Sequence, residues 1–187
     1  ACANAPSIPS RQFTAMTRLD QNRAVGQIAE HAGVPASHIS DVFIWGNHAN
    51  TMYPDPRFGT IEEVPVTDMF DAEWLQGQFI ETVSTRGKAI IVARGASSAA
   101  SAASAAIDHM RDWWQGSNGR IVSMAIPSEG WYGVPEGLVF SFPCRCENGD
   151  IEVVEDLPID KFAQSKIDEN ISVLLEERNA VSELLGS

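Results

Sequence analysis

The sequence predicts an α+β fold in which antiparallel strands are flanked by long helices. Two stretches, 71–86 and 160–185, place apolar residues at helical spacing, which is typical of amphipathic helices lying on a core. Apolar runs that are typical of strands lie at 121–126, 138–144 and 151–154. Asn148-Gly149 separates the last two runs. Because Asn-Gly is a strong hairpin signal, we expect these two strands to pair antiparallel.

The first third of the chain is expected to contain a helix and a buried strand. Asp20 suits the start of a helix, and Gly33, followed by Pro35, is expected to end it. The short apolar run 42–45 is followed by a glycine and predicts a buried strand that leads into a loop. His48 lies just beyond it, in a position where functional residues often gather.

The middle of the chain is expected to be mainly helical. Before it, residues 60–66 predict a short exposed strand, which Pro65 restricts to the edge of a sheet. Gly87 is expected to break the helix of 71–86, and residues 88–114 then predict a second long helix.

The centre of this second helix, 95–106, consists almost entirely of Gly, Ala and Ser. Small residues let another backbone or a ligand approach closely, which leaves two interpretations. In one, the segment packs tightly as a helix, which alanine favours. In the other, Ser97 and Ser98 line a ligand pocket. Gly95 is expected to mark a kink.

The last third of the chain ends in the helix of 160–185, whose apolar face needs a partner in this chain or in another. Gly130, Gly133 and Gly137 are spaced through the turn that precedes the second strand. We interpret them as turn residues rather than as a phosphate-binding loop.

Length and composition set further bounds. A chain of 187 residues is near the usual size of one domain, so residues 1–187 are expected to form a single domain. The net charge of −12 disfavours nucleic acid and anionic membranes as partners, because both would repel the chain. The sequence contains no apolar run of membrane-spanning length and no hydrophobic leader.

Three cysteines, Cys2, Cys144 and Cys146, do not form an even disulfide framework, so we expect a reducing compartment, the cytoplasm. Cys144 and Cys146 alternate along a predicted strand and therefore point the same way, but a zinc site requires a second pair of ligands. We expect no metal site and interpret these residues as ordinary buried cysteines.

Asp20, Arg23 and His48 are the candidate functional residues. Asp20 and Arg23 are three positions apart, so on a helix they share a face. An imidazole held by a carboxylate is a good reversible proton acceptor, and a guanidinium matches a substrate carboxylate through two parallel hydrogen bonds. On spacing alone, an Asp-x-x-Arg pair is most often a helix-surface ion pair, and a lone histidine after a strand is more often a turn residue.

Two motifs carry a resemblance to a known family. Residues 14–24 read Thr-Ala-Met-Thr-Arg-Leu-Asp-Gln-Asn-Arg-Ala, and His48, in Ile-Trp-Gly-Asn-His, follows Asp20 by 28 positions. Together they resemble the catalytic segment of NAD-dependent malate dehydrogenases of the cytosolic type, in the lactate/malate dehydrogenase superfamily. The resemblance continues along nearly the whole chain, through 94–103, 107–114 and 133–143.

The resemblance implies the C-terminal, substrate-binding half of an enzyme that interconverts malate and oxaloacetate with NAD. It implies that His48 is the proton acceptor, Asp20 its partner and Arg23 the clamp on the substrate carboxylate. Ser97 and Ser98 would line the pocket near the substrate, and His48 and Ser97 would lie beside the nicotinamide. A small dicarboxylate substrate and a homodimeric assembly are further expectations.

The family also has an amino-terminal nucleotide-binding half with a glycine fingerprint, and a mobile loop whose arginines close over the substrate. The 187 residues contain no Gly-x-Gly-x-x-Gly motif, and Arg11 and Arg18 lack the context of that loop. We therefore expect the chain, which begins at Ala1 rather than Met, to be a fragment or an isolated domain. Alone, it is expected to show little turnover.

Two other functions stay open at this stage. One is a non-catalytic module that inherited the fold and dimerises through its long helices. The other is an enzyme for a different small hydroxy acid, because the loop that selects the substrate is absent from the sequence. The sequence also leaves open whether NAD or NADP is preferred.

Overall fold

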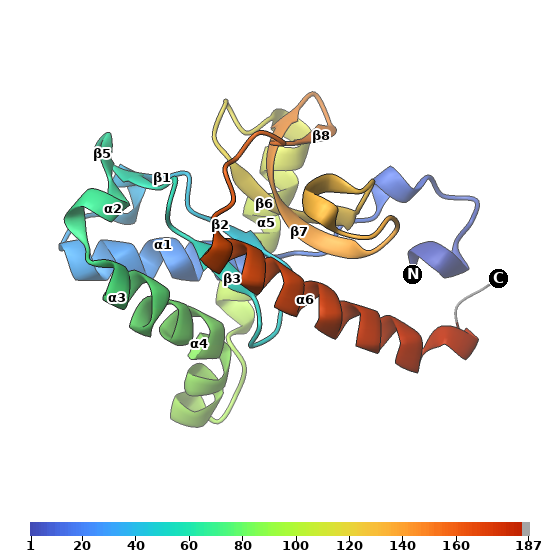
Figure 1. Ribbon diagram of the computed structural model, residues 1–187, viewed down its shortest axis with the longest axis horizontal. Helices are drawn as coiled ribbons and strands as arrows, with labels where there is room; N and C mark the ends of the chain where they lie inside the picture. Colours follow the sequence, from blue (N-terminus) through green and yellow to red (C-terminus); the bar gives the residue numbers. More distant parts are fainter. Residues whose placement is uncertain (185–187) are drawn as a thin grey trace.

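A computed structural model of the chain describes residues 1–184 and confirms the α+β class, with antiparallel strands at the centre and helices around them (Figure 1). The α-helices are α1 (Arg18–Ala32), α2 (Val66–Met69), α3 (Ala72–Gln76), α4 (Gln78–Arg94), α5 (Ala99–Gln115) and α6 (Lys161–Ala180). The strands are β1 (Ile39–Ser40), β2 (Phe43–Trp45), β3 (Tyr53–Asp55), β4 (Thr60–Ile61), β5 (Val64–Pro65), β6 (Val122–Pro127), β7 (Val139–Glu147) and β8 (Asp150–Val153). Short 3-10 turns lie at Cys2–Asn4, Ser10–Gln12, Ala36–His38, Trp131–Gly133 and Ser182–Leu184.

The largest sheet has the order β6-β7-β8 and is antiparallel throughout. The expected hairpin between β7 and β8 is present, and its turn residues Asn148 and Gly149 have φ angles of 53° and 88°. Such positive values are what a two-residue hairpin turn requires, and Asn and Gly adopt them at low cost. The β2–β3 hairpin is joined to this sheet by a single antiparallel bridge from Gly46 to Ser141 of β7.

Strand β2 lies between the two apolar cores of the molecule. Phe43 and Trp45 belong to the core around β6 and β7, whereas Val42 and Ile44 belong to the core that α1, α3 and α4 cover. Successive side chains of a strand point to opposite sides, so a run of four apolar residues satisfies both cores. All four are fully buried. The segment that leads to His48 is therefore fixed from both sides.

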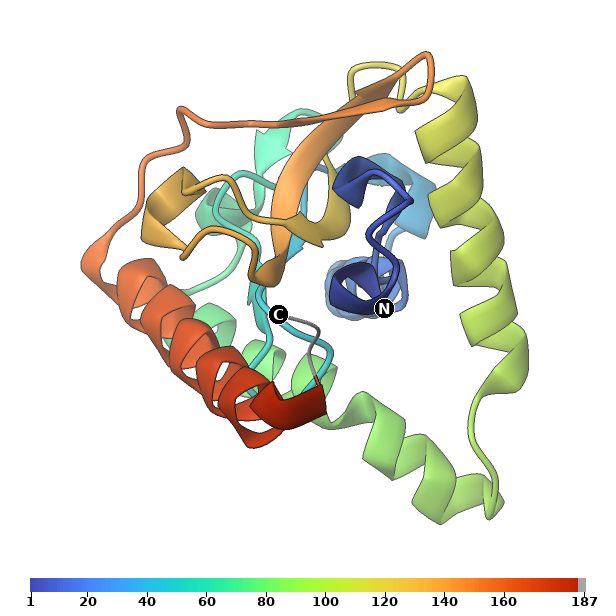
Figure 2. The same ribbon diagram turned by 90° about the vertical axis from the view of Figure 1, so that its right-hand side faces the viewer.

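Helix α1 packs against both α4 and α5. Figure 2 looks almost along the axis of α1. The link to α5 includes a buried ion pair between Arg18 and Asp112, and Arg120 donates to the same carboxylate at 2.9 Å. The helix ends at Gly33, as expected, in the left-handed conformation with φ 70°. It begins at Arg18, slightly before the expected start, so Asp20 lies in its first turn.

The expected boundaries of the middle helices were wrong. Gly77, not Gly87, interrupts the first segment, between α3 and α4, and Gly87 lies inside α4. A Cβ atom at position 87 would lie 3.5 Å from Nη2 of Arg23, which is an ordinary van der Waals distance, so α4 passes beside the Arg23 side chain without requiring a glycine there. Gly95 ends α4 in the left-handed conformation rather than kinking a continuous helix, and α5 begins only at Ala99.

Two further expectations need correction. Residues 60–66 do not form one strand: β4 and β5 are a tight hairpin around Glu62 and Glu63, whose φ angles are positive, and β4 pairs with β1. The last helix ends at Ala180, and Leu185, the expected end, lies outside the described residues. Among residues 1–184, no helix has the length and apolar character needed to cross a membrane.

The ion pair between α1 and α5 gives a prediction about stability. Asp112→Asn should lower the free energy of unfolding by about 3 kcal/mol, because removing one partner leaves the buried Arg18 charge uncompensated. Asp108→Asn is a matched control on the same helix, since Asp108 pairs with the half-exposed Arg111 and should contribute less than about 1 kcal/mol. Urea unfolding of the three proteins measures both values. Equal effects of the two substitutions would contradict this interpretation.

Candidate active site

One buried carboxylate joins the three candidate residues. Oδ2 of Asp20 lies 2.5 Å from Nδ1 of His48, and its Oδ1 accepts a hydrogen bond from Nη1 of Arg23 at 3.1 Å. Asp20 is fully buried, the Arg23 side chain is 12% exposed and the His48 side chain is 55% exposed. The structure therefore brings together the acid, the guanidinium and the imidazole, with the imidazole facing outward.

The acid is held at a helix end that favours it. Asp20 lies in the first turn of α1, where the partial positive charge of the helix N-terminus stabilises a carboxylate. Arg23 is one turn further along, and its guanidinium lies beside Gly87 of α4. Asp20 and Arg23 thus share a helix face, as their spacing indicates.

Ser141 of β7 connects the acid segment to the histidine segment. Its hydroxyl donates to the carbonyl of Ile44 at 2.8 Å and lies 2.7 Å from the hydroxyl of Thr17, the residue that precedes α1. Its backbone also exchanges hydrogen bonds with Gly46. One residue of the central sheet therefore fixes both the start of α1 and the end of β2. Sequence reasoning missed Ser141, because its only signal is a polar residue inside an apolar strand.

The loop that carries His48 is braced internally by Asn47. The side chain of Asn47 donates to Thr51 Oγ1 at 2.9 Å and accepts from the backbone N–H of Ala49 at 3.1 Å. Gly46 opens the loop with φ 96°, a conformation that glycine adopts without strain. These contacts define the path of the backbone on both sides of the histidine.

The surroundings of His48 favour its protonated form. The hydrogen bond to Asp20 raises the pKa of His48 above the ordinary value of 6.5, and the negative charge of Asp20 adds to this effect. Partial burial and the positive charge of Arg23 lower the pKa but do not cancel the rise. Nε2 of the ring makes no hydrogen bond to any described residue, so this nitrogen is free to exchange a proton with a ligand.

Arg23 also lines an open groove of about 400 Å³ between α1, α4 and α5. The groove is polar along part of its wall, which includes Asn22, Arg86, Ser101 and Ser104. His48 lies outside this lining. Sequence reasoning missed Ser101 and Ser104, although they lie within the same small-residue stretch as the expected serines.

The structure does not bring Ser97 and Ser98 to the three candidate residues. Ser97 is exposed in the connection between α4 and α5, and Ser98 is the half-buried residue that precedes α5. Among the described residues, neither side chain makes a hydrogen bond to Asp20, Arg23 or His48. Their role as pocket residues stays a prediction.

The cysteines of β7 are buried and free. Burial raises the pKa of the Cys146 thiol to about 12 and that of Cys144 well above its ordinary value. Both are therefore protonated thiols at neutral pH. Within residues 1–184 there is no group of three or more His, Cys, Asp or Glu residues arranged to hold a metal ion.

Comparison with known proteins identifies the family to which this α+β domain belongs. Residues 17–185 match the model of the family described as lactate/malate dehydrogenase, alpha/beta C-terminal domain. The chain belongs to this family, and its fold is that of the C-terminal domain of lactate and malate dehydrogenases.

Solved structures agree with this assignment. The chain is 47% identical to malate dehydrogenase from Naegleria fowleri over 98% of its own length, with a TM-score of 0.91. It is 34% identical to a Trichomonas vaginalis lactate dehydrogenase, solved with NADH and oxamate, over 96% of its length, also with a TM-score of 0.91. The match covers 57% and 56% of those two chains, so the present chain spans less than two thirds of their length.

The contact between His48 and Asp20 gives a prediction about pH. Asp20→Asn should lower the pKa of His48, because it removes the carboxylate that favours the imidazolium and leaves the charge of Arg23 unopposed. NMR titration of the His48 ring measures the change, and Glu30→Gln, an exposed position on the same helix, is the control that should leave it unaltered. An unchanged titration in Asp20→Asn would show that the contact is absent in solution.

The raised pKa of His48 also determines how the contribution of the Asp20–His48 pair to stability depends on pH. Because pairing raises the folded-state pKa, the pair contributes fully below pH 6.5, and its contribution is lost as the pH rises through the raised value. The difference in the free energy of unfolding between the wild type and Asp20→Asn should therefore become smaller as the pH rises from 6.5 through the raised pKa of His48, which urea unfolding at several pH values measures.

Proposed function

We propose that residues 1–187 are the substrate-binding and catalytic domain of an NAD-dependent malate dehydrogenase of the cytosolic type. The observation that carries this proposal is the buried carboxylate of Asp20, one oxygen of which pairs with the exposed imidazole of His48 and the other with the guanidinium of Arg23. The higher identity to a malate dehydrogenase than to a lactate dehydrogenase, 47% against 34%, supports malate and oxaloacetate as the substrate pair. A different small hydroxy acid is the alternative within the same enzyme class.

In this proposal, each residue performs one task. Nε2 of His48 takes the hydroxyl proton of malate, and the carboxylate of Asp20 stabilises the imidazolium that forms. The guanidinium of Arg23 binds a carboxylate of the substrate through two parallel hydrogen bonds and so fixes its orientation. The proton acceptor is suited to reversible transfer, because Asp20 raises the pKa of His48 from a value already near neutral pH.

In this proposal, the present chain would contact the nicotinamide ring of the cofactor but would not bind its phosphates. The exposed face of His48 is open to a ring beside it, whereas the sequence contains no glycine-rich loop to bind the phosphates. When bound, NAD supplies the acceptor for the hydride that leaves the substrate carbon. We propose that a nucleotide-binding half outside these residues holds the cofactor, and that Ser97 and Ser98 lie near the substrate and nicotinamide once that half is in place.

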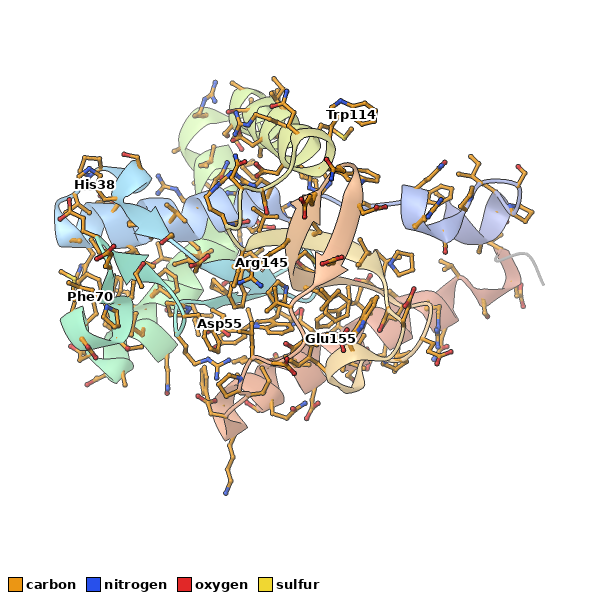
Figure 3. The ribbon with its side chains drawn as sticks, turned by 90° about the horizontal axis from the view of Figure 1, so that it is seen from above. His38, Asp55, Phe70, Trp114, Arg145 and Glu155 are labelled. Atoms are coloured by element: carbon orange, nitrogen blue, oxygen red, sulfur yellow. The ribbon has the colours of Figure 1, made fainter. Side chains whose placement is uncertain are left out.

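A homodimer is also part of the proposal, because α5 exposes an apolar row. Ile107, Met110 and Trp114 are 66%, 54% and 77% exposed and lie on one side of the helix at spacings of three and four residues. Figure 3 shows Trp114 projecting away from the body of the molecule. A second copy of the chain would cover this row. The same row supports the second candidate function, a non-catalytic module that only dimerises.

Ligand titration tests the proposed function. Calorimetry should detect binding of oxaloacetate or oxamate to the chain, and Arg23→Ala should weaken it about tenfold or more, since hydrogen bonds between charged groups contribute about 1.5–3 kcal/mol. Arg111→Ala removes the same charge from an exposed site on α5 and is the matched control. With NADH and oxaloacetate, the 187-residue chain alone should show little turnover, and a rate near that of a complete enzyme would contradict the need for a second half.

The same samples distinguish the two candidate functions. Carboxylate binding that depends on Arg23 supports the dehydrogenase domain. Tight self-association in sedimentation velocity, with no carboxylate binding by the wild type, would support the dimerising module instead.

A further inference from the structure

Asn170 of α6 is a fully buried polar residue on an otherwise apolar helix face. Ile167 and Ala163, on the same side, are fully buried in the core around β6 and β7. An amide at this position is costly unless its hydrogen bonds are made, because burial removes it from water. An apolar side chain at position 170 would pack α6 against the core without needing hydrogen-bond partners.

The amide of Asn170 binds both ends of the His48 loop. Its Oδ1 accepts the backbone N–H of Asn47 at 3.1 Å, and its Nδ2 donates to the carbonyl of Thr51 at 2.6 Å. Nδ2 also donates to Lys166 within α6 at 2.9 Å. One side chain therefore closes the segment 47–51, and His48 is the first residue inside it.

Gly46 makes this approach possible. A Cβ atom at position 46 would lie 2.0 Å from Oδ1 of Asn170, closer than any real contact, and the φ angle of 96° is one that other residues adopt rarely. Gly46 and Asn170 therefore form a matched pair, in which the absence of one side chain provides the space that the other fills.

Helix α6 has other attachments that do not involve the loop. Asp160 accepts from the backbone N–H of Ala163 at 2.8 Å at the start of the helix, and it pairs with Arg57 at 3.2 Å. Arg57 in turn pairs with the buried Asp55 at 2.7 Å. With these contacts and the buried Ile167, α6 is anchored independently of Asn170. The contacts of Asn170 are directed at the loop.

We propose that Asn170 is a positioning residue, which holds the His48 loop against α6 so that Nδ1 of His48 stays on Asp20. It acts through the loop backbone and makes no hydrogen bond to the imidazole. The His48 side chain is more than half exposed, and among the described residues its ring is hydrogen-bonded to Asp20 alone. The inference deepens the proposed function, since it rests on His48 as the proton acceptor. It also makes the geometry of the proton acceptor depend on the C-terminal helix.

NMR titration of the His48 ring tests this inference without a substrate. In Asn170→Ser, which loses both loop contacts, the titration midpoint of His48 should move downward toward that of Asp20→Asn. Ile167→Ala is the matched control on α6: it removes apolar packing but no contact to the loop, so it should lower the unfolding temperature and leave the midpoint in place. An unchanged midpoint in Asn170→Ser, or equal shifts in both variants, would overturn the proposal.

A second variant approaches the same contact from the other side. Gly46→Ala places a methyl group against the amide of Asn170 and should also lower the midpoint of His48 while α6 stays folded. The Gly46→Ala variant serves if Asn170→Ser does not fold, because an unchanged titration midpoint of His48 in Gly46→Ala would also overturn the proposal. If the wild type does not bind a carboxylate, the proposed function is contradicted. The His48 midpoints of the two variants would still show whether Asn170 positions the loop.

Discussion

The arrangement of the site depends on the burial of one carboxylate, that of Asp20. A buried charge is costly unless charged or polar partners surround it, and here the two oxygens have separate partners, His48 and Arg23. Removing either partner would leave the acid partly uncompensated. The same contacts that compensate the buried acid therefore bring together the imidazole and the guanidinium, to which we assign proton transfer and anion binding.

The two segments that carry these residues are fixed by the packing of β2. Because Val42 to Trp45 face two cores in alternation, a shift of the strand by one residue would direct the large Phe43 and Trp45 side chains into the core that holds Val42 and Ile44. Ser141 then ties the end of this strand to the residue before α1. The central sheet thus sets the relative position of the two backbone segments that carry the acid and the imidazole, and Asn170 of α6 then holds the His48 loop.

Local signals predicted much of this fold, and long-range contacts explain what they missed. The strands of the main sheet, the Asn-Gly hairpin and the end of α1 at Gly33 follow from periodicity and turn chemistry. Gly87 was misread as a break because the packing of α4 against α1, two segments far apart in the sequence, outweighs the low helix propensity of one glycine. Ser141 was missed for the same reason: its hydroxyl acts between segments that are far apart in the sequence. Residue chemistry suggested the pairing of Asp20 with His48, and the resemblance favoured it over the ordinary surface roles that spacing alone also allowed.

The central claim is that Asp20 accepts a hydrogen bond from Nδ1 of His48 and leaves Nε2 as the basic nitrogen. The tautomer of the neutral ring tests it most directly, through the nitrogen chemical shifts of histidine-labelled protein above the His48 pKa. The account predicts a proton on Nδ1 and a bare Nε2. A neutral ring that carries its proton on Nε2 would contradict it, because the nitrogen that we propose takes the substrate proton would then be unable to accept one.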